Sequence, residues 1–322
     1  MSPTITPSGS IWSADGCRWC PRACGAARHA GAAGRCGESD VCRVAQIGAH
    51  FGEEPPLTGR RGSGAVFFTG CACRCFFCQN HQISTGGAGR TYPADELFDA
   101  VHTLAKTGVH NLNFVTADHV WPHVARLCAR LRAAAVTLPF VFNSSGYHRP
   151  DHVPAYAEWM DIFLPDFKFA DPDLARTVMG DERYPRLALE SLQRMVAARG
   201  FLEPWDPTGA TVARRGVLVR HLVLPGAVNN SLAVVRLLRE EFGRYLPLSL
   251  MSQYRPVAAC AGRGDFARRV TAEEYRRVTE EVERLGFEQV FIQPDVTNDD
   301  FLPDFSRPQP FRGNPPPVTA NA

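Results

Sequence analysis

The chain has 322 residues, a hydrophobic fraction of 45% and a formal net charge of +2. A nearly neutral chain of ordinary hydrophobicity gives no case for binding nucleic acid or a membrane surface. The sequence contains no run of eighteen apolar residues, which a membrane-spanning helix requires, and its first sixteen residues lack a signal-peptide pattern. We therefore expect a globular, cytoplasmic protein that has no nucleic-acid or membrane partner.

Cysteine is unusually frequent in this chain. There are eleven cysteines, a high and odd number. In a small secreted domain such a number would indicate disulfides, but in a chain without a leader it indicates metal binding in a reducing compartment.

Strand patterns recur along most of the chain. Residues 1–16 are expected to be disordered, and residues 17–60 form an N-terminal segment rich in Cys, Gly, Ala and Arg. Residues 301–322 contain six prolines and are expected to form an unstructured tail. Between them, short apolar runs predict seven strands, at 65–69, 112–116, 139–143, 161–169, 217–224, 246–252 and 289–293.

Helical patterns alternate with these strands. Apolar residues at helical spacing predict helices at 94–107, 121–131, 186–199 and 231–242. A last helix is predicted from the capping box of Thr271 and Glu274, with an apolar face of Tyr275, Val278, Val282 and Leu285. The alternation predicts an α/β fold with a parallel sheet over residues 61–300, and six or seven such units fit a TIM-type barrel or part of one.

Three cysteines follow the first predicted strand directly. Cys71, Cys75 and Cys78 have the spacing C-x3-C-x2-C, and Phe77 precedes the last of them. Three thiolates fit a [4Fe–4S] cluster with one iron left free for a small-molecule ligand, which is the centre that reductive cleavage of S-adenosylmethionine needs. The alternative is a zinc site completed by Cys73 or His81.

This motif resembles the cluster loop of the radical S-adenosylmethionine (SAM) superfamily. Further blocks between about Cys17 and Asp295 resemble pyruvate formate-lyase activating enzyme-like proteins, namely 17–25, 34–37, 50–55, 61–64, 166–168 and 219–226. The resemblance implies a partial (β/α)6 barrel, a [4Fe–4S] cluster, S-adenosyl-L-methionine as cofactor and a one-electron donor of the flavodoxin or ferredoxin type. It also implies a protein substrate, a glycyl residue of a partner enzyme, and a small molecule or another protein is the alternative.

Asp166 and Lys168 form a candidate pair in the strand predicted at 161–169. Residues two apart in a strand share a face, so both enter the barrel interior if Phe163, Phe167 and Phe169 face the helices. Lysine is rare here: only Lys106 and Lys168 occur among 35 basic residues, which indicates that a compact ammonium is required at 168. A purely structural ion pair is the alternative.

The family resemblance also implies roles for residues at other strand ends. By this resemblance Lys168 contacts the methionine carboxylate of the cofactor, and Asp166 orients it or bonds the ribose. Other cofactor contacts are implied for Phe77, Asn143, Ser144, Ser145 and Arg220, while His221 packs outside the barrel. Gln253 and Tyr254 follow the strand predicted at 246–252, and from this position we expect them to approach the adenine. The chain departs from the family at 116–119, where Thr-Ala-Asp-His replaces a Gly-Gly-Glu segment that binds the amino group. Asp118 or backbone carbonyls are the open replacements.

A second cysteine set lies in the N-terminal segment. Cys17, Cys20, Cys24 and Cys36 have the spacing C-x2-C-x3-C-x11-C, and Cys42 is a fifth candidate. Four thiolates suit a structural zinc ion or a second iron–sulfur cluster, and ordinary free thiols are the alternative.

These observations predict an iron–sulfur enzyme that cleaves S-adenosylmethionine to a 5′-deoxyadenosyl radical, which abstracts hydrogen from a substrate. A non-enzymatic metal or electron-transfer protein is the alternative, although the chain is far larger than an electron carrier requires.

Overall fold

The computed structural model describes residues 11–294 and 302–311. Its strands form a seven-stranded sheet in the order β3-β1-β2-β4-β5-β6-β7 and a three-stranded sheet in the order β10-β9-β8. The strands are β1 (Arg43–His50), β2 (Ser63–Phe68), β3 (Arg90–Thr91), β4 (Leu112–Val115), β5 (Phe140–Ser144), β6 (Ile162–Pro165), β7 (Gly216–Val217), β8 (Val219–Leu222), β9 (Leu248–Met251) and β10 (Val290–Ile292).

Most neighbouring strands are parallel. The strands from β2 through β4, β5 and β6 to β7 pair in parallel, as do β8, β9 and β10, whereas β1 pairs with β2 and with β3 in antiparallel fashion. The two sheets meet at a parallel bridge between Asp166 and Arg220, where the Phe167 N–H donates to the Arg220 carbonyl over 2.7 Å. Together they form the predicted mostly parallel α/β architecture, which is confirmed.

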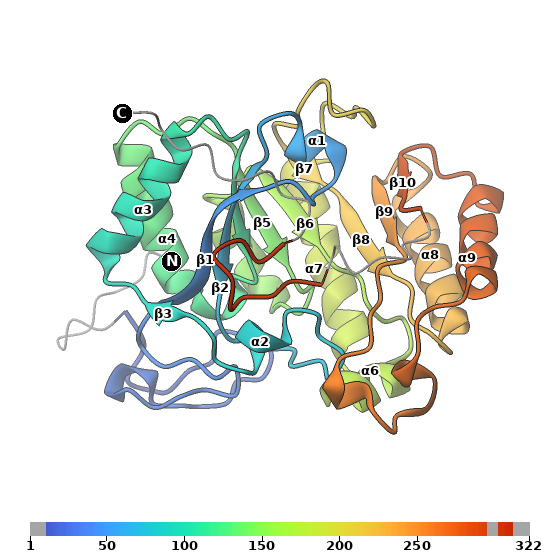
Figure 1. Ribbon diagram of the computed structural model, residues 1–322, viewed down its shortest axis with the longest axis horizontal. Coiled ribbons are helices and arrows are strands. Elements are labelled where there is room, and N and C mark those ends of the chain that lie inside the picture. The colour runs from blue at the N-terminus through green and yellow to red at the C-terminus, as the bar shows by residue number, and fades with distance from the viewer. Residues whose placement is uncertain (1–10, 295–301, 312–322) are drawn as a thin grey trace.

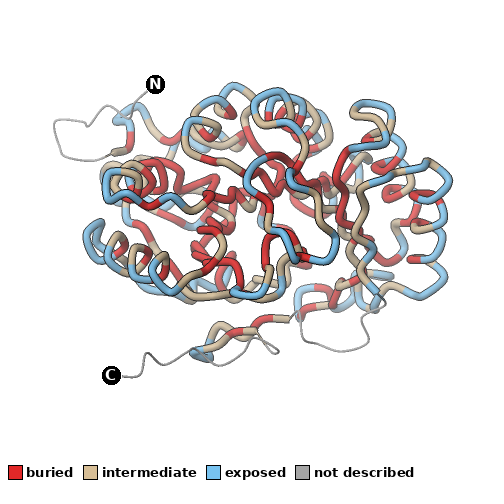
Figure 2. Tube along the Cα trace, turned by 90° about the horizontal axis from the view of Figure 1, so that it is seen from above, coloured by how far each residue is buried: buried red, intermediate tan, exposed pale blue. Residues whose placement is uncertain are grey.

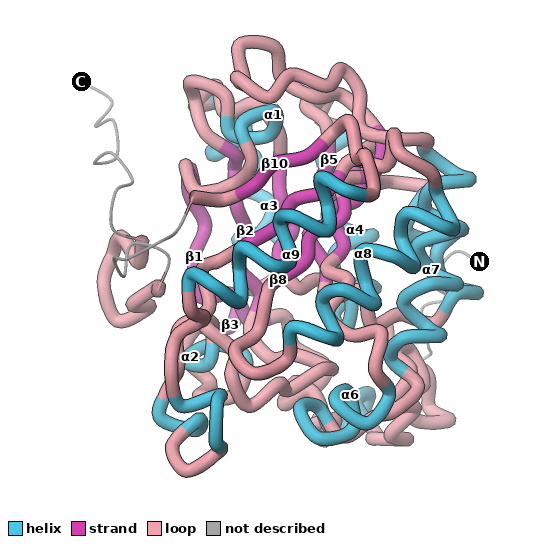
Figure 3. The backbone as a smooth tube through the Cα atoms, turned by 90° about the vertical axis from the view of Figure 1, so that its right-hand side faces the viewer, coloured by secondary structure: helices cyan, strands magenta, loops and turns pink. Residues whose placement is uncertain are grey.

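Helices cover the outside of this curved wall of strands (Figure 1). In Figure 3 α8 and α9 lie in front of the strands and α7 lies beside them, and α3 and α4 lie at the other end of the sheet in Figure 1. None of the helices in the described part of the chain is long and apolar enough to cross a membrane. The α-helices are α1 (Pro55–Thr58), α2 (His81–Ser84), α3 (Ala94–Lys106), α4 (Trp121–Ala133), α5 (Val153–Ala157), α6 (Pro172–Met179), α7 (Tyr184–Arg199), α8 (Val228–Phe242) and α9 (Ala272–Arg284).

The core lies between the strands and these helices, and Figure 2 shows the burial concentrated along the central strands. The predicted apolar stripes account for it: α3 buries Leu97, Val101 and Leu104. Helix α4 buries its stripe in the same way, and α9 buries Tyr275, Val278 and Val282. At the start of α9, the Thr271 hydroxyl and the Glu274 carboxylate cap each other's backbone N–H as the sequence predicts.

All seven predicted strands occur, with two differences in detail. The strand predicted at 161–169 ends its regular pairing at Pro165, and residues 166–169 continue past the bridge to Arg220. The strand predicted at 217–224 is divided, because Val217 pairs with β6 while Val219 pairs with β9. Both differences lie at the junction of the two sheets.

Other segments differ from the expectations. Strand β1 and helix α6 were not predicted. Residues 11–16 were expected to be disordered, but Trp12 is buried and the Arg28 guanidinium lies 3.5 Å from its ring centroid. Part of the tail that we expected to be unstructured, residues 302–311, packs on the barrel and crosses in front of β1 and β2 (dark red in Figure 1). Residues 1–10, 301 and 312–322 lie outside the described residues.

Candidate functional site

A cavity of about 460 Å³ lies at the carboxyl ends of the parallel strands. It is lined by residues that directly follow β2, β4, β5 and β6, and by residues of β8, β9 and β10. Eleven of the twelve residues predicted for the cluster or the cofactor line this one cavity: Cys71, Cys75, Phe77, Cys78, Asn143, Ser144, Ser145, Asp166, Lys168, Arg220 and Gln253. The structure therefore brings together positions that lie between Cys71 and Gln253 in the sequence.

The cysteine loop, residues 70–78, forms one wall of the cavity. Cys71 and Cys75 are buried, and the hydroxyl of Ser84 donates to the Cys78 sulfur over 3.3 Å. The additional Cys73 also lines the cavity. A hydrogen bond with Cys73, together with burial, raises the pKa of the Cys71 thiol well above its usual value, and burial does the same for Cys73.

The cysteine loop has the donor set that a four-iron cluster requires. In the part of the chain that the structure describes, no three His, Cys, Asp or Glu side chains are arranged to hold a single metal ion. A four-iron cluster makes a different demand, because each thiolate binds a different iron atom. Three thiols on one loop, at a cavity that also holds the Lys168 ammonium, fit such a cluster.

Asp166 and Lys168 face the cavity as the strand pattern predicts. The Lys168 ammonium donates to the Asp166 carboxylate, and the two side chains are 19% and 24% exposed. Phe163, Phe167 and Phe169 are fully buried in the core on the other side. Burial alone would lower the pKa of Lys168, but the Asp166 carboxylate outweighs it and raises that pKa well above its usual value.

Tyr184, at the start of α7, fixes the strand ends beside this pair. Its hydroxyl lies 3.0 Å from the carbonyl oxygens of Ser145 and Asp166 and accepts the Lys168 N–H over 3.0 Å. Gly146 allows this close approach, because its φ is +73° and a Cβ there would lie 2.0 Å from the Asp166 carbonyl oxygen. The ends of β5 and β6 are thus held together by one buried hydroxyl.

A buried charged network lies on another wall of the cavity. The Arg220 guanidinium donates to both carboxylate oxygens of Glu54, over 2.8 and 2.6 Å, and to Glu53. The other Glu53 oxygen accepts from the side-chain amides of Asn113, over 2.8 Å, and Asn143, over 3.3 Å. Burial alone would raise the pKa of Glu53, but Arg220 outweighs it and holds that pKa below its usual range.

This network bears on two predicted cofactor contacts. Arg220 enters the barrel as expected, while His221 points outward and bonds the Phe167 carbonyl and the Ser231 hydroxyl. The guanidinium of Arg220 is bound to two carboxylates, and the Asn143 amide is bound to one of them. That these two residues contact a cofactor stays a prediction.

The segment that replaces Gly-Gly-Glu has a distinctive backbone. Thr116 lines the cavity and has a φ of +56°, an uncommon conformation for a residue with a branched side chain. Asp118 does not line the cavity; it accepts from the Ser145 hydroxyl over 3.3 Å, and burial raises its pKa to about 7. Backbone groups at Thr116 are therefore nearer to the cavity than the Asp118 carboxylate.

Aromatic side chains close two further sides of the cavity. Phe77 lines it and stacks on Phe266, with ring centroids 6.2 Å apart. Phe311, from the 302–311 segment, also lines it, with its centroid 4.3 Å from that of His50. Tyr254 is different from the expectation: it is buried, and its hydroxyl donates to the Phe266 carbonyl, so Gln253 alone of the predicted pair lines the cavity.

The N-terminal cysteines gather in one small region. The sulfurs of Cys24 and Cys36 each lie 3.4 Å from the point where a Cβ on Gly34 would stand. Burial, together with the nearby thiols of Cys36, Cys17 and Cys24, raises the pKa of Cys20 to about 12. Backbone N–H groups two residues further along, of Arg22 and Ala26, bond the sulfurs of Cys20 and Cys24.

Sequence reasoning missed several cavity residues. Glu53 and Glu54 were noted only as part of a resembling block, although two adjacent acidic residues before Pro55-Pro56 were an available signal. The left-handed backbone conformation of Thr116 could not be predicted, because threonine rarely adopts it. Phe311 was placed in the tail on composition alone.

The sequence was compared with models of protein families and with known proteins. Residues 65–201 match the model of the Radical SAM superfamily. The chain is 25% identical over 248 residues to the uncharacterized protein MJ0674 of Methanocaldococcus jannaschii, covering 75% of this chain and 67% of that protein.

Two solved structures are similar at lower levels. SuiB of Streptococcus suis, solved with bound S-adenosylmethionine, matches with a TM-score of 0.43 and 10% identity over 70% of this chain and 48% of that one. Methylornithine synthase (PylB) matches with a TM-score of 0.45 and 14% identity, over 69% of this chain and 60% of that one. The chain thus spans about half to three fifths of these proteins, and neither similarity is close enough to assign a residue or a substrate.

The charged network predicts a pH-dependent effect on stability. Arg220→Met leaves Glu53 and Glu54 buried without a counter-ion, so we expect the free energy of unfolding at pH 7 to fall by roughly 3–5 kcal/mol. The low pKa of Glu53 in the folded protein contributes stability above its unfolded pKa, and this stability is lost as the pH falls. The difference between variant and parent should therefore shrink as the pH falls below about 4, where the glutamates of the unfolded chain become protonated before Glu53 of the folded protein.

Urea unfolding at the two pH values measures this difference. The matched control is Arg215→Met, which removes an exposed pair with Glu203 and should cost at most about 1 kcal/mol. An Arg220→Met effect as small as the control, or one that stays constant with pH, would contradict the role assigned to the network.

Proposed function

We propose that this protein, whose residues 65–201 match the model of the Radical SAM superfamily, reductively cleaves S-adenosylmethionine and uses the resulting 5′-deoxyadenosyl radical to abstract hydrogen from a substrate. The observation that carries the proposal is the single cavity that holds Cys71, Cys75 and Cys78 together with the Asp166–Lys168 pair. When bound to these thiolates, a [4Fe–4S] cluster supplies the electron that breaks the sulfur–carbon bond.

The chain's own residues bind and orient the cofactor in this proposal. Lys168 presents a compact positive charge for the methionine carboxylate, and Asp166 fixes its position. Phe77 offers an aromatic face for the adenine, and Ser145 and Asn143 offer polar groups for the ribose. A volume of about 460 Å³ lies within the usual range for pockets that hold a ligand of this size.

The same cavity separates this function from the non-enzymatic alternative. An electron carrier needs access to its cluster but no enclosed space lined by a Lys–Asp pair and aromatic rings. Formation of 5′-deoxyadenosine from S-adenosylmethionine by the reduced protein distinguishes the two, because an electron carrier would hold iron and form none.

The first prediction concerns the cysteine loop. After anaerobic reconstitution, the triple variant Cys71→Ala, Cys75→Ala, Cys78→Ala should lack the iron and sulfide of this cluster and should form no 5′-deoxyadenosine when reduced with dithionite. Cys128→Ala, which removes a buried thiol of α4 away from the cavity, is the control and should behave as the parent. Product formation by the triple variant would overturn the assignment.

The second prediction concerns Lys168. Lys168→Arg keeps the positive charge but replaces a compact ammonium by a larger planar group. We expect binding of S-adenosylmethionine to weaken by about tenfold, as loss of one well-placed contact of about 1.4 kcal/mol implies, with the iron content unchanged. Lys106→Arg, at the other lysine of the chain, is exposed and should leave both quantities as they are. Unchanged affinity in Lys168→Arg would favour a purely structural ion pair.

The electron and the substrate must come from partners. We propose a donor of the flavodoxin or ferredoxin type, and a glycyl residue of a partner enzyme as the substrate. The sequence blocks that resemble pyruvate formate-lyase activating enzyme-like proteins support this substrate. A partner that co-purifies anaerobically and gains a glycyl radical signal in electron paramagnetic resonance spectra would support it, and product formation with a small molecule alone would replace it.

We propose also that Cys17, Cys20, Cys24 and Cys36 bind their own metal, either zinc or a second iron–sulfur cluster. Their thiols lie near one another in a segment poor in large apolar side chains, where metal binding would add folding free energy directly. Among the described residues these sulfurs do not surround a single point, so binding requires small movements of their loops.

Metal analysis of the Cys71/Cys75/Cys78 triple variant tests this second site. We expect about one zinc ion or one cluster per chain to remain after anaerobic purification, and to disappear when Cys17→Ala and Cys20→Ala are added. Cys42→Ala in place of that pair is the control and should retain the metal. A triple variant that binds no metal and stays folded would leave these cysteines as ordinary thiols.

A further inference from the structure

We propose that the N-terminal cysteine segment, residues 17–42, clamps the cysteine loop in its ligand-binding shape, and that Arg22 is the positioning residue of this clamp. The inference rests on the proposed function in one respect, that the loop holds the cluster. It assigns to the N-terminal segment a task in the chemistry of the cavity, although Arg22 itself does not line the cavity.

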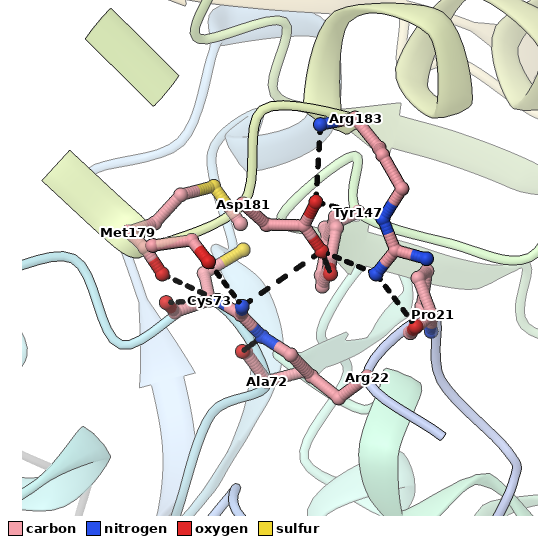
Figure 4. A network of polar contacts seen from close by, with 9 residues as sticks. Pro21, Arg22, Ala72, Cys73, Tyr147, Met179, Asp181 and Arg183 are labelled. Carbon is pink, nitrogen blue, oxygen red and sulfur yellow. Dashed lines mark hydrogen bonds and ion pairs between the residues drawn. The ribbon is translucent and has the colours of Figure 1, made fainter. Parts of the chain in front are cut away.

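Arg22 reaches into the protein and bonds the cysteine loop from behind. Its Nε donates to the Ala72 carbonyl over 3.0 Å, and one terminal nitrogen lies 3.2 Å from the Cys73 carbonyl (Figure 4). These two carbonyls belong to the residues between the proposed ligands Cys71 and Cys75. The side chain of Arg22 is only 7% exposed, so water does not replace these bonds easily.

The remaining donors of Arg22 bind the turn between α6 and α7. They reach the carbonyls of Met179 and Gly180, over 2.5 and 3.0 Å, and one lies 3.8 Å from the Asp181 carboxylate. Figure 4 shows the guanidinium between the cysteine loop on one side and this turn on the other. Arg22 thus ties three separate stretches of chain at one point.

The turn is itself firmly held. The Asp181 carboxylate accepts two bonds from the Arg183 guanidinium, over 2.8 and 2.6 Å, and one from the Tyr147 hydroxyl. Arg183 also donates to the Pro21 carbonyl over 3.1 Å (Figure 4). The Pro21–Arg22 dipeptide is therefore bound from both sides, and it gives the loop a fixed reference point.

Two further contacts continue the clamp along the loop. The Cys71 N–H donates to the Cys36 carbonyl over 3.1 Å, and the Arg74 side chain donates to the Arg35 carbonyl over 3.0 Å. Each of the four residues 71–74 is thus bonded to the N-terminal cysteine segment. Both arms of that segment, around Arg22 and around Cys36, carry cysteines of the second set.

The backbone of the loop shows why it needs a clamp. Arg74 has a φ of +53°, a left-handed conformation that residues other than glycine rarely adopt. Such a conformation persists only where the surrounding contacts hold it. Because Arg74 lies between Cys73 and Cys75, its backbone sets the direction in which the next proposed ligand points. Without Arg22 and Arg35, we expect the loop to relax and its thiols to separate.

The position of Arg22 also gives the clamp a means of control. It lies between Cys20 and Cys24, so the state of these two thiols, free or metal-bound, acts on the residue that holds the loop. Loading of the N-terminal cysteines would then precede stable loading of the cysteine loop.

Thiol accessibility in the reduced, metal-free protein tests the clamp without any activity. We would label full-length protein with iodoacetamide over time and follow each cysteine by peptide mass spectrometry. In Arg22→Ala we expect Cys71 and Cys75 to react about tenfold faster or more, because local opening governs the access to buried groups. Cys128 and Cys260, which are fully buried elsewhere, should keep their rates and so report an intact fold.

Two further variants complete the experiment. Arg22→Lys keeps the charge but cannot span all the carbonyls, so it should show a smaller increase in the same two rates. If Arg22→Ala unfolds and exposes Cys128, the lysine variant decides the question. Arg18→Ala removes an exposed arginine of the same segment and should match the parent. Rates for Cys71 and Cys75 that stay at the parent's level in a folded Arg22 variant overturn the proposal.

Iron uptake then links the clamp to the proposed function. After anaerobic reconstitution, Arg22→Ala should hold less iron at the cysteine loop than the parent and Arg18→Ala. If the parent itself takes up no iron at this loop, the proposed function fails, whereas the labelling rates still decide whether Arg22 positions the loop.

Discussion

The hydrogen bond from the Phe167 N–H to the Arg220 carbonyl, 2.7 Å long, joins the two sheets of this protein into one curved wall. Without this junction the seven-stranded and three-stranded sheets would share no strand pairing in the described chain. The junction brings the end of β6 beside β8, and it directs Asp166, Lys168 and Arg220 into one cavity. The site therefore depends on a backbone interaction between segments that are some fifty residues apart.

The cavity is lined by two groups of paired charges. Lys168 and Asp166 neutralise each other beside the cysteine loop. Arg220 is shared by Glu53 and Glu54, which reach it from the chain just before α1. Burying such groups costs free energy unless each is paired and hydrogen-bonded. The network therefore holds the segment around Glu53 in one position. Strand β1, which precedes this segment, pairs with β2 in antiparallel fashion.

Much of the fold could be predicted from the sequence, because the strands and longer helices have strong periodic patterns of apolar residues. Strand β1 was missed for a physical reason: only Val44 and His50 of its eight residues are buried, so it lacks the alternation that reveals a half-buried strand. Helix α6 is two turns long, too short for an apolar stripe to stand out, although Asp171 caps it.

Site residues that directly follow strands were predicted from the sequence. Site residues held by side-chain contacts with residues far away in the sequence were missed. Cys71, Asp166 and Lys168 follow strands directly, and parallel strands place such residues on one edge. Glu54 meets Arg220 across 166 residues of sequence, and Arg22 meets the cysteine loop across about fifty, and no local pattern reports either contact. The tail was judged by its proline content, which does not report that Phe305 and Phe311 pack on Phe67.

The central claim is that the cysteine loop and the Asp166–Lys168 pair serve one cofactor in one cavity. Electron paramagnetic resonance spectroscopy of the reduced, reconstituted protein, recorded with and without S-adenosylmethionine, tests it most directly. A cluster held by three cysteines has an iron without a protein ligand, so the account predicts that the cofactor changes the spectrum of the parent, and that Lys168→Arg needs about tenfold more cofactor for the same change. A spectrum of the parent that S-adenosylmethionine leaves unchanged at saturating concentration would contradict the account.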